Sequence, residues 1–240
     1  MSGDEAFWRT YARVYDEVLQ IIPYQNLLFE IIERAGIDHT SRVLDACCGA
    51  ANLLWALDRQ HVASTVVGLD YSDAMLARAR AKVGRYAGTA NLIKTDLTQP
   101  VSAWGVTGQF DRVIFNNSLC LLPNPADVLA KTATLAAPGA KLVASTPRPN
   151  PNIQELLDQH LQLSEDAGIS REKALQDILP RLQPLLKCNE QLLKHYGDEF
   201  HVPNEPQLRA WFAGSGWRVV DLDLTYAGQN WLVVAEKVAA

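Results

Sequence analysis

Three aspartates, Asp45, Asp70 and Asp96, each end a short apolar run that is typical of a β-strand. Asp45 is followed at once by residues 47–51 (CCGAA), a turn of small residues that lets backbone approach a ligand closely. The carboxyl ends of parallel strands meet at one sheet edge, where ligands bind in open α/β folds. The three acids therefore predict a converging site. Asp70 could accept hydrogen bonds from the ribose hydroxyls of a nucleoside, and Asp96 could meet its base.

The elements that must position these acids alternate along the chain between strand and helix. Runs typical of strands occur at residues 42–46, 65–70, 91–96, 110–115, 141–145, 217–224 and 231–236. Between several of these runs, apolar residues recur at helical spacing, and Ser72 is placed to cap one such helix. This alternation predicts an α/β fold with right-handed βαβ crossovers and a mostly parallel sheet, in a single domain over residues 1–240.

Two helical segments fall outside this alternation. In residues 1–36, apolar spacing predicts one helix over residues 5–22, ended by Pro23, and a second helix that stops at Gly36. Residues 150–195 are also helical in character, with many leucines and a polar side. We interpret this second segment as a helical cap inserted after the fifth strand, and we expect both segments to act as lids over the sheet edge.

Composition and charge exclude several classes of partner and site. The net charge of −5 and the absence of a Lys/Arg cluster argue against nucleic acid, and no apolar run reaches the roughly 20 residues that span a bilayer. An acidic N-terminus without an apolar signal core predicts a cytoplasmic protein. The four cysteines fit neither a disulfide framework nor a zinc site. We expect a small-molecule partner, no stable membrane insertion, and a monomer or homodimer.

The order and spacing of the motifs resemble a class I methyltransferase that uses S-adenosylmethionine (SAM). The matching segments are residues 45–51, 68–72 (GLDYS), 95–97 (TDL), 115–118 (FNNS) and 135–140 (LAAPGA). Within that family, residues 11–16 (YARVYD) and the double cysteine look most like the ubiquinone/menaquinone methyltransferase-like group. The resemblance implies a Rossmann-like, seven-stranded, mostly parallel sheet with helices on both faces and a reversed last strand.

The same resemblance implies how SAM would be held. Asp45 and the turn after it would cradle the methionine part, Asp70 would hold the ribose, and Asp96 would read the adenine. The full set implied for the cofactor is Tyr11, Tyr15, Asp45, Cys47, Gly49, Asp70, Tyr71, Met75, Asp96, Leu97 and Asn116. The family's three spaced glycines stand here as Cys47, Gly49 and Ala51, and two of these residues adopt positive φ less readily than glycine.

Each of these residues also has a purely structural interpretation. Asp70 could face a helix dipole, and Asp96 could be a turn acid. Tyr11 and Tyr15 are four residues apart, so they could simply pack a helix against the sheet. Cys47 could be a reactive thiol at a helix start, although we interpret it first as a turn residue.

Methyl transfer from a sulfonium is an in-line displacement that needs orientation and exclusion of water more than a catalytic triad. The candidate proton acceptors are His195, Tyr196 and His201, which could equally be solvated residues. Asn116 and Asn117 stand where metal-dependent relatives carry acids, so we expect no metal.

The predicted reaction is transfer of a methyl group to a small, largely apolar acceptor of natural-product, quinone or lipid type. A nicotinamide-dependent oxidoreductase fits poorly, because the turn has one glycine and Asp45 would face the pyrophosphate. A non-catalytic binding or scaffold protein on the same fold is the remaining alternative.

Overall fold

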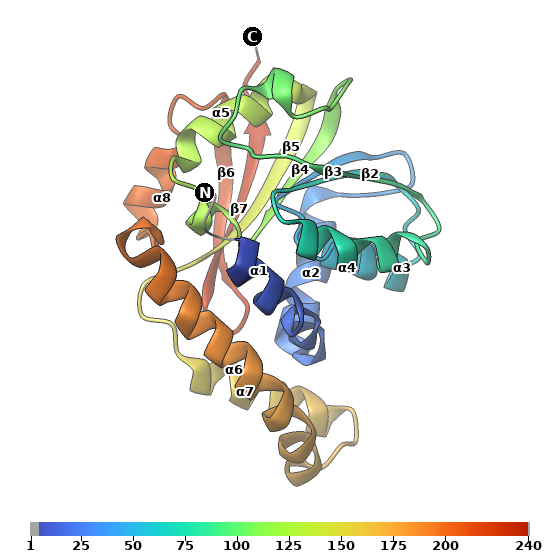
Figure 1. The fold of residues 1–240 in the computed structure, drawn as a ribbon, viewed down its shortest axis with the longest axis vertical. Helices are drawn as coiled ribbons and strands as arrows, with labels where there is room; N and C mark the ends of the chain where they lie inside the picture. The colour runs from blue at the N-terminus through green and yellow to red at the C-terminus, as the bar shows by residue number, and fades with distance from the viewer. Residues whose placement is uncertain (1–4, 240) are drawn as a thin grey trace.

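A seven-stranded sheet forms the centre of the protein, for which a computed structural model describes residues 5–239 (Figure 1). The strands are β1 (Arg42–Ala46), β2 (Thr65–Asp70), β3 (Thr89–Lys94), β4 (Phe110–Asn116), β5 (Ala136–Pro147), β6 (Trp217–Thr225) and β7 (Asn230–Lys237). Their order in the sheet is β3-β2-β1-β4-β5-β7-β6. All neighbouring pairs from β3 to β5 are parallel, and β7 runs antiparallel to both β5 and β6. This topology confirms the predicted Rossmann-like sheet with its reversed last strand.

Helices cover both faces of the sheet, as predicted. They are α1 (Glu5–Ala12), α2 (Ile22–Ala35), α3 (Asn52–Arg59), α4 (Asp73–Val83), α5 (Pro125–Leu135), α6 (Ile153–Asp166), α7 (Arg171–Tyr196) and α8 (Glu205–Phe212). Short 3₁₀ turns are η1 (Tyr15–Gln20), η2 (Val101–Ala103), η3 (Leu119–Leu121) and η4 (Gly197–Glu199). Alternate residues of a strand point to opposite faces, so Val43 packs with α2 and α3, whereas Leu44 packs with α5 and α8.

The capping signals behave as the sequence predicts. The side chain of Ser72 accepts a hydrogen bond from the backbone N–H of Met75 and so begins α4. Asn124 caps α5 in the same way, with Pro125 in the first turn, where its missing N–H costs nothing. Strands β1 and β2 are almost wholly buried, which explains their continuous apolar runs. Asp45 and Asp70, near the carboxyl ends of these strands, are therefore fixed on a rigid frame.

The N-terminal segment differs from the single helix predicted over residues 5–22. Helix α1 stops at Ala12, η1 follows, and α2 begins at Ile22. Pro23 lies in the first turn of α2, where proline is well tolerated, so it begins a helix rather than ending one. Helix α2 belongs to the buried layer on one sheet face, since Leu27, Leu28 and Ile31 are fully buried. Within residues 1–36, α1 and η1 are therefore the part that could act as a lid, which stays a prediction. Residues 1–4 lie outside the described residues.

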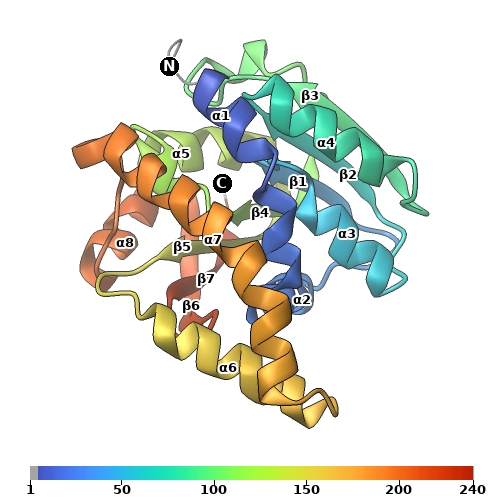
Figure 2. The same cartoon turned by 60° about the horizontal axis from the view of Figure 1, so that its bottom comes forward.

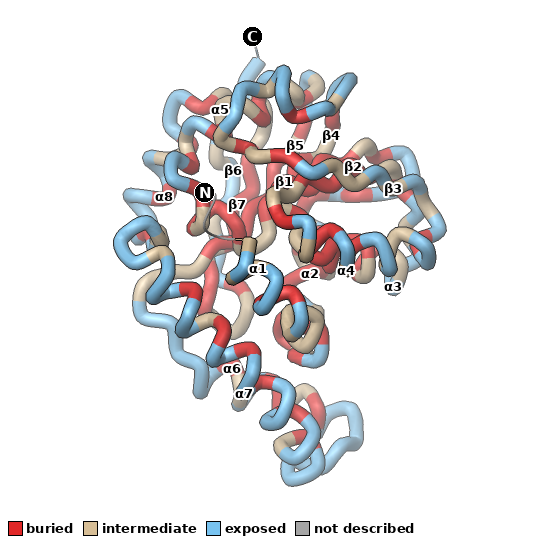
Figure 3. The backbone as a smooth tube through the Cα atoms, viewed as in Figure 1, coloured by how far each residue is buried: buried red, intermediate tan, exposed pale blue. Residues whose placement is uncertain are grey.

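The inserted segment is a helical hairpin of α6 and α7 (Figure 2). Helix α6 contacts α2, and α7 contacts α1 and η1. Buried side chains of α7, among them Ile178, Leu182 and Leu185, join the same apolar cluster as α2 and β1. Buried and exposed positions alternate along both helices, whereas β1, β2, β4, β5 and β7 are mostly buried (Figure 3). The hairpin is therefore attached to the α2 side of the sheet.

Within residues 5–239, no helix combines the length and the apolar character needed to cross a membrane.

Candidate active site

The turn after β1 has an unusual backbone. Cys47, Gly49 and Ala51 all have positive φ, at 58°, 54° and 56°. For residues other than glycine this conformation costs about 1–3 kcal/mol. A Cβ atom added at Gly49 would lie 3.7 Å from the ring of Tyr15. The three positions that carry glycines in the resembling family thus keep the glycine conformation, although cysteine and alanine occupy two of them.

The carboxylate of Asp45 lies beneath this turn and has no hydrogen-bond donor among residues 5–239. Asp45 as a whole is only 3% exposed to solvent. Burial raises its pKa to about 8, and the negative charge of Asp70 adds to the shift. The Oδ1 atom of Asn52, at the start of α3, is also buried without a partner in the described chain. Buried acceptors without donors are costly, so the Asp45 carboxylate and the Asn52 amide oxygen fit a bound ligand that brings donors of its own.

Asp70 at the end of β2 is held by backbone on both sides. Its Oδ2 accepts from Gly49 N at 2.8 Å, and its Oδ1 accepts from Ser72 N at 2.8 Å. Burial raises the pKa of Asp70 to about 6, while these hydrogen bonds oppose the shift. Asp70 therefore joins β2 to the turn after β1. Its predicted contact with ribose stays a prediction.

A second set of side chains supports the same turn from α4 and η1, and the sequence analysis did not identify it. Lys82 Nζ donates to the carbonyl of Ala50 at 2.7 Å and to Asp16 Oδ1 at 2.7 Å. Arg78 Nη2 lies 2.9 Å from Asp16 Oδ2. Because Asp16 follows Tyr15, this ion-pair network holds both the turn and the ring above it. Only the folded chain reveals it, since Asp16 is more than 60 residues from Arg78 and Lys82, and Lys82 is 32 residues from Ala50.

The remaining cofactor candidates flank the turn. Tyr71 directly follows β2, and Met75 is buried in the first turn of α4. Asp96 Oδ1 accepts hydrogen bonds from the backbone and hydroxyl of Thr98, at 2.9 and 2.7 Å. Partial burial would raise the pKa of Asp96, but these bonds hold it below its ordinary value. Asp96 thus has the geometry of a turn acid. The predicted adenine contact of Asp96 and of the buried Leu97 stays a prediction.

Four tyrosines gather beside the turn. Tyr11 and Tyr15 have ring centroids 5.4 Å apart, and Tyr24 and Tyr226 meet edge to face at 5.9 Å. In addition to burial, the hydroxyl of Tyr24 interacts with Tyr15 closely enough to raise the pKa of Tyr15. Burial raises the pKa of each of the four, so all are neutral near pH 7. Tyr24 and Tyr226 were missed in the sequence; the position of Tyr226 in a loop at a strand end is the signal that could have found it.

Asn116 connects this aromatic group to the sheet. Its Nδ2 donates to the Tyr24 hydroxyl at 3.0 Å, and its Oδ1 accepts from Ser145 Oγ at 2.9 Å. Asn117 has a positive φ of 54°, and its Oδ1 accepts from the side chain of Asn230. The amides therefore have fixed orientations at the ends of β4, β5 and β7.

The three candidate proton acceptors fall into two places. His195 is exposed and stacks on Phe7 of α1, with Tyr196 at its edge. The backbone N–H of His201 donates to the carbonyl of Cys120 in η3 at 2.9 Å. The imidazole Nε2 of His201 is buried without a partner among residues 5–239. A role for any of them in proton transfer stays a prediction. The described chain contains no cluster of His, Cys, Asp or Glu suited to a metal ion.

We predict that Cys47→Gly is tolerated. Glycine relieves the backbone strain at φ 58° but makes the unfolded chain more flexible, so the free energy of unfolding should change by less than about 1 kcal/mol. Binding of S-adenosylhomocysteine should be at least as tight as in the parent. Cys48→Gly is the control, because Cys48 is buried without positive φ and should lose stability. Urea unfolding and titration calorimetry measure both. A large loss of affinity in Cys47→Gly would show that the thiol makes a specific contact.

We also predict that Asp45 makes the unliganded protein less stable as pH rises. The folded protein keeps a proton on Asp45 up to a pKa of about 8, whereas the unfolded chain releases it near 3.8. This contribution to stability is present below about pH 4 and is lost as pH rises through about 8, by at most about 1.4 kcal/mol per pH unit. Asp45→Asn should flatten the pH dependence in urea unfolding from pH 4.5 to 8. Asp73→Asn, at an exposed site, should leave it unchanged; an unaltered slope in Asp45→Asn would contradict the prediction.

Curated proteins similar in sequence match part of this chain. Trans-aconitate 2-methyltransferase of Mycobacterium tuberculosis is 29% identical over 119 residues, which cover 50% of this chain and 42% of that protein. Ubiquinone biosynthesis O-methyltransferase of Hahella chejuensis is 34% identical over 121 residues, covering 50% and 49%. Carboxy-S-adenosyl-L-methionine synthase of Methylococcus capsulatus is 36% identical over 107 residues, covering 41% and 44%. The chain thus spans about half the length of the curated relatives it matches.

Solved structures share the fold over most of the chain. Magnesium protoporphyrin IX methyltransferase of Synechocystis, solved with S-adenosylhomocysteine, superposes with a TM-score of 0.58 at 19% identity, covering 91% of this chain and 85% of that one. A SAM-dependent methyltransferase of Aquifex aeolicus gives 0.59 at 16% identity, covering 88% and 89%. A family model described as a methyltransferase domain matches residues 21–222. With this match over most of its length, the chain belongs to the methyltransferase-domain family.

Proposed function

We propose that this protein binds SAM at the carboxyl edge of β1, β2 and β4 and transfers its methyl group to a small, largely apolar acceptor. The observation that carries the proposal is the buried Asp45 carboxylate, which has no donor among residues 5–239 and lies beneath a turn with three positive φ angles. An ammonium group such as that of the methionine part of SAM would supply the missing donors and the opposite charge. The four neutral tyrosines and Asn116 then surround the place where methyl and acceptor would meet.

SAM would supply the electrophilic methyl group on its sulfonium. Asp70 would keep the turn in place while accepting from ribose, and Lys82 would hold the carbonyl of Ala50 out of the ligand's way. The hairpin of α6 and α7, with α1, would exclude water from the reacting atoms. These residues act by binding and orientation, which is the main requirement of an in-line displacement.

The type of acceptor is argued from the surroundings of the turn. Aromatic faces of Tyr11, Tyr15, Tyr24 and Tyr226 favour a flat, mostly apolar molecule. The similarity to a ubiquinone biosynthesis O-methyltransferase supports a quinone-like or phenolic acceptor, and the net charge of −5 disfavours nucleic acid. A scaffold protein without activity is less well supported, because it would keep the cost of burying Asp45 without a ligand to offset it.

The first experiment is titration calorimetry with S-adenosylhomocysteine. The parent should bind, and Asp70→Ala should bind more weakly by about 1.5–3 kcal/mol, because charge-assisted hydrogen bonds are lost. Asp73→Ala is the matched control: it removes an exposed acid three residues away and should leave binding unchanged. A mass-shift screen of phenols, quinols and lipids with SAM then seeks a gain of one methyl group. No binding by the parent would refute the proposed function.

A further prediction concerns the two expected lids, α1 with η1 and the hairpin of α6 and α7. Tyr11 Oη donates to Asn189 Oδ1 of α7 at 2.6 Å, and the rings of Phe7 and His195 stack with centroids 5.6 Å apart. These contacts close α1 against α7 at the edge where the cofactor is expected. Hydrogen exchange should therefore slow in residues 7–16 and 150–195 when S-adenosylhomocysteine binds. Equal protection with and without it would mean that both segments are static parts of the core.

A further inference from the structure

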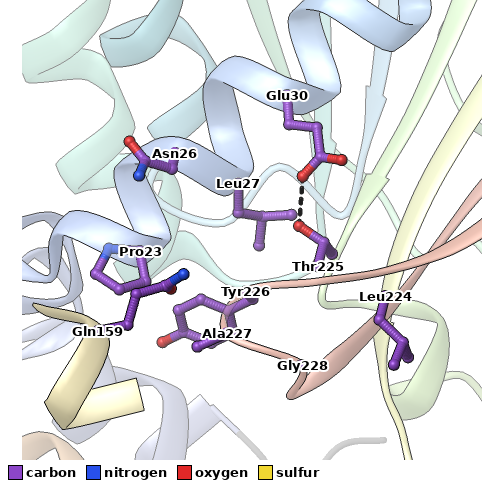
Figure 4. Close-up of a pocket in the computed structure, with 10 residues that line it drawn as sticks. All are labelled: Pro23, Asn26, Leu27, Glu30, Gln159, Leu224, Thr225, Tyr226, Ala227 and Gly228. Atoms are coloured by element: carbon purple, nitrogen blue, oxygen red, sulfur yellow. Dashed lines mark hydrogen bonds between the residues drawn. The ribbon is translucent and has the colours of Figure 1, made fainter. Parts of the chain in front are cut away.

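A pocket of about 270 Å³ opens between α2, α6 and the hairpin that joins β6 to β7 (Figure 4). Its lining consists of Pro23, Asn26, Leu27, Glu30, Gln159, Leu224, Thr225, Tyr226, Ala227 and Gly228. Helix α6 belongs to the inserted hairpin, and β6 and β1 point their carboxyl ends to the same sheet edge. The pocket therefore adjoins the candidate active site, but it contains none of the residues expected to hold SAM.

The polar groups of this pocket are largely unused. Glu30 is the one charged residue in the lining. Its Oε2 accepts from Thr225 Oγ1 at 2.5 Å, and within residues 5–239 its other oxygen has no hydrogen-bond donor. Asn26 and Gln159 are exposed at the mouth of the pocket, and their side-chain amides make no hydrogen bonds to described residues either. A carboxylate oxygen with two amides nearby is a site for a group that donates hydrogen bonds.

The charges around the pocket favour a cation. Arg34 follows Glu30 by one turn of α2, but its guanidinium binds both Asp221 and Asp223 of β6. Near the hairpin, Arg148 binds the carbonyl of Gly228, and the carboxylate of Glu155 lies close to the same residue. Both arginines are thus already paired with acceptors. The two arginines and the four acids (Glu30, Glu155, Asp221 and Asp223) together carry a negative net charge.

Tyr226 forms the wall between the pocket and the candidate active site. Tyr226 and Ala227 have φ angles of 55° and 53°, and Gly228 follows at 72°. Positive φ at successive residues is what a tight turn between antiparallel strands requires, and two of these residues are not glycine. The conformation directs the Tyr226 ring against Tyr24, whose hydroxyl receives the hydrogen bond from Asn116. One face of the pocket thus leads to the group beside the expected methyl donor.

We propose that this pocket binds the end of the acceptor remote from the methylated atom, and that Glu30 and Tyr226 select acceptors whose remote end is a protonated amine. The proposal rests on the proposed function and names the class of acceptor: an apolar, aromatic body that lies along the tyrosines, with an ammonium group beyond Tyr226. A carboxylate and an aromatic ring are the pair of groups that recognise ammonium ions. A volume of 270 Å³ suits one end of a small molecule better than a whole one.

The test uses three probes with the same phenol body and different ends: tyramine (ammonium), 4-ethylphenol (methyl) and 3-(4-hydroxyphenyl)propionate (carboxylate). Each is titrated into the protein saturated with S-adenosylhomocysteine. Tyramine should bind about tenfold more tightly than 4-ethylphenol, a preference equal to about 1.4 kcal/mol, and the propionate should bind most weakly. Glu30→Gln should remove the preference. Glu33→Gln, which removes an exposed acid one turn along α2, should keep it.

Each other outcome has a definite meaning. Equal binding of tyramine and 4-ethylphenol by the parent, no binding of any probe, or an unchanged preference in Glu30→Gln would overturn the proposal. Tyr226→Ala should weaken all three probes and leave S-adenosylhomocysteine binding intact; full retention of probe affinity would also count against it. Failure of S-adenosylhomocysteine to bind the parent would instead refute the proposed function, so the two failures are distinguishable.

Discussion

The burial of Asp45 without an internal donor is the constraint on which the rest of the site depends. Burial raises the pKa of the carboxylate in this position, so the folded state becomes less stable as Asp45 ionises. The surrounding fold tolerates this cost because β1 lies in the middle of the sheet, where packing on both faces fixes its position. A ligand with a positive donor would offset the cost on binding. Affinity for such a ligand and modest stability without it are therefore two consequences of one buried charge.

The turn above Asp45 keeps its shape through contacts from three directions. Asp70 holds Gly49 from β2, Lys82 holds Ala50 from α4, and Tyr15 covers the turn from η1. This support explains how cysteine and alanine can occupy left-handed positions that glycine usually fills. Their strain is small beside the packing of the neighbouring core, and the backbone conformation is what a ligand would contact.

The α6–α7 hairpin divides the surroundings of the site into two parts with different chemistry. Helix α7 meets α1 through Tyr11 and Asn189, on the side where the cofactor is expected. Helix α6 meets α2 and leaves the polar pocket that contains Glu30. Tyr24 and Tyr226 connect the two sides, because Tyr226 lines the pocket and its ring packs against Tyr24 beside Asn116. The cofactor expected at the turn and the acceptor proposed at the pocket would therefore be contacted by different helices of the insert.

The sequence alone determined the sheet, and it predicts the edge of the sheet at which a ligand would bind. Periodic apolar runs located all seven strands, and acids at strand ends located the edge where a ligand would bind, because both signals are local. The end of α1 at Ala12, the 3₁₀ turn η1 after it and the start of α2 before Pro23 were not foreseen. Pro23 fits the first turn of a helix as well as it ends one, and the ion pairs of Asp16 with α4 are contacts between distant segments.

Only the tertiary structure decided which side chains meet. In the folded chain, His195 stacks on Phe7, whereas the backbone of His201 contacts Cys120. Asp96 accepts a hydrogen bond from Thr98. Tyr24 and Tyr226 meet although they lie near opposite ends of the chain. It also formed the pocket at Glu30, which needs α2, α6 and a hairpin some 195 residues further along the sequence. Such sites depend on contacts between remote segments, whose partners no local pattern of residues specifies.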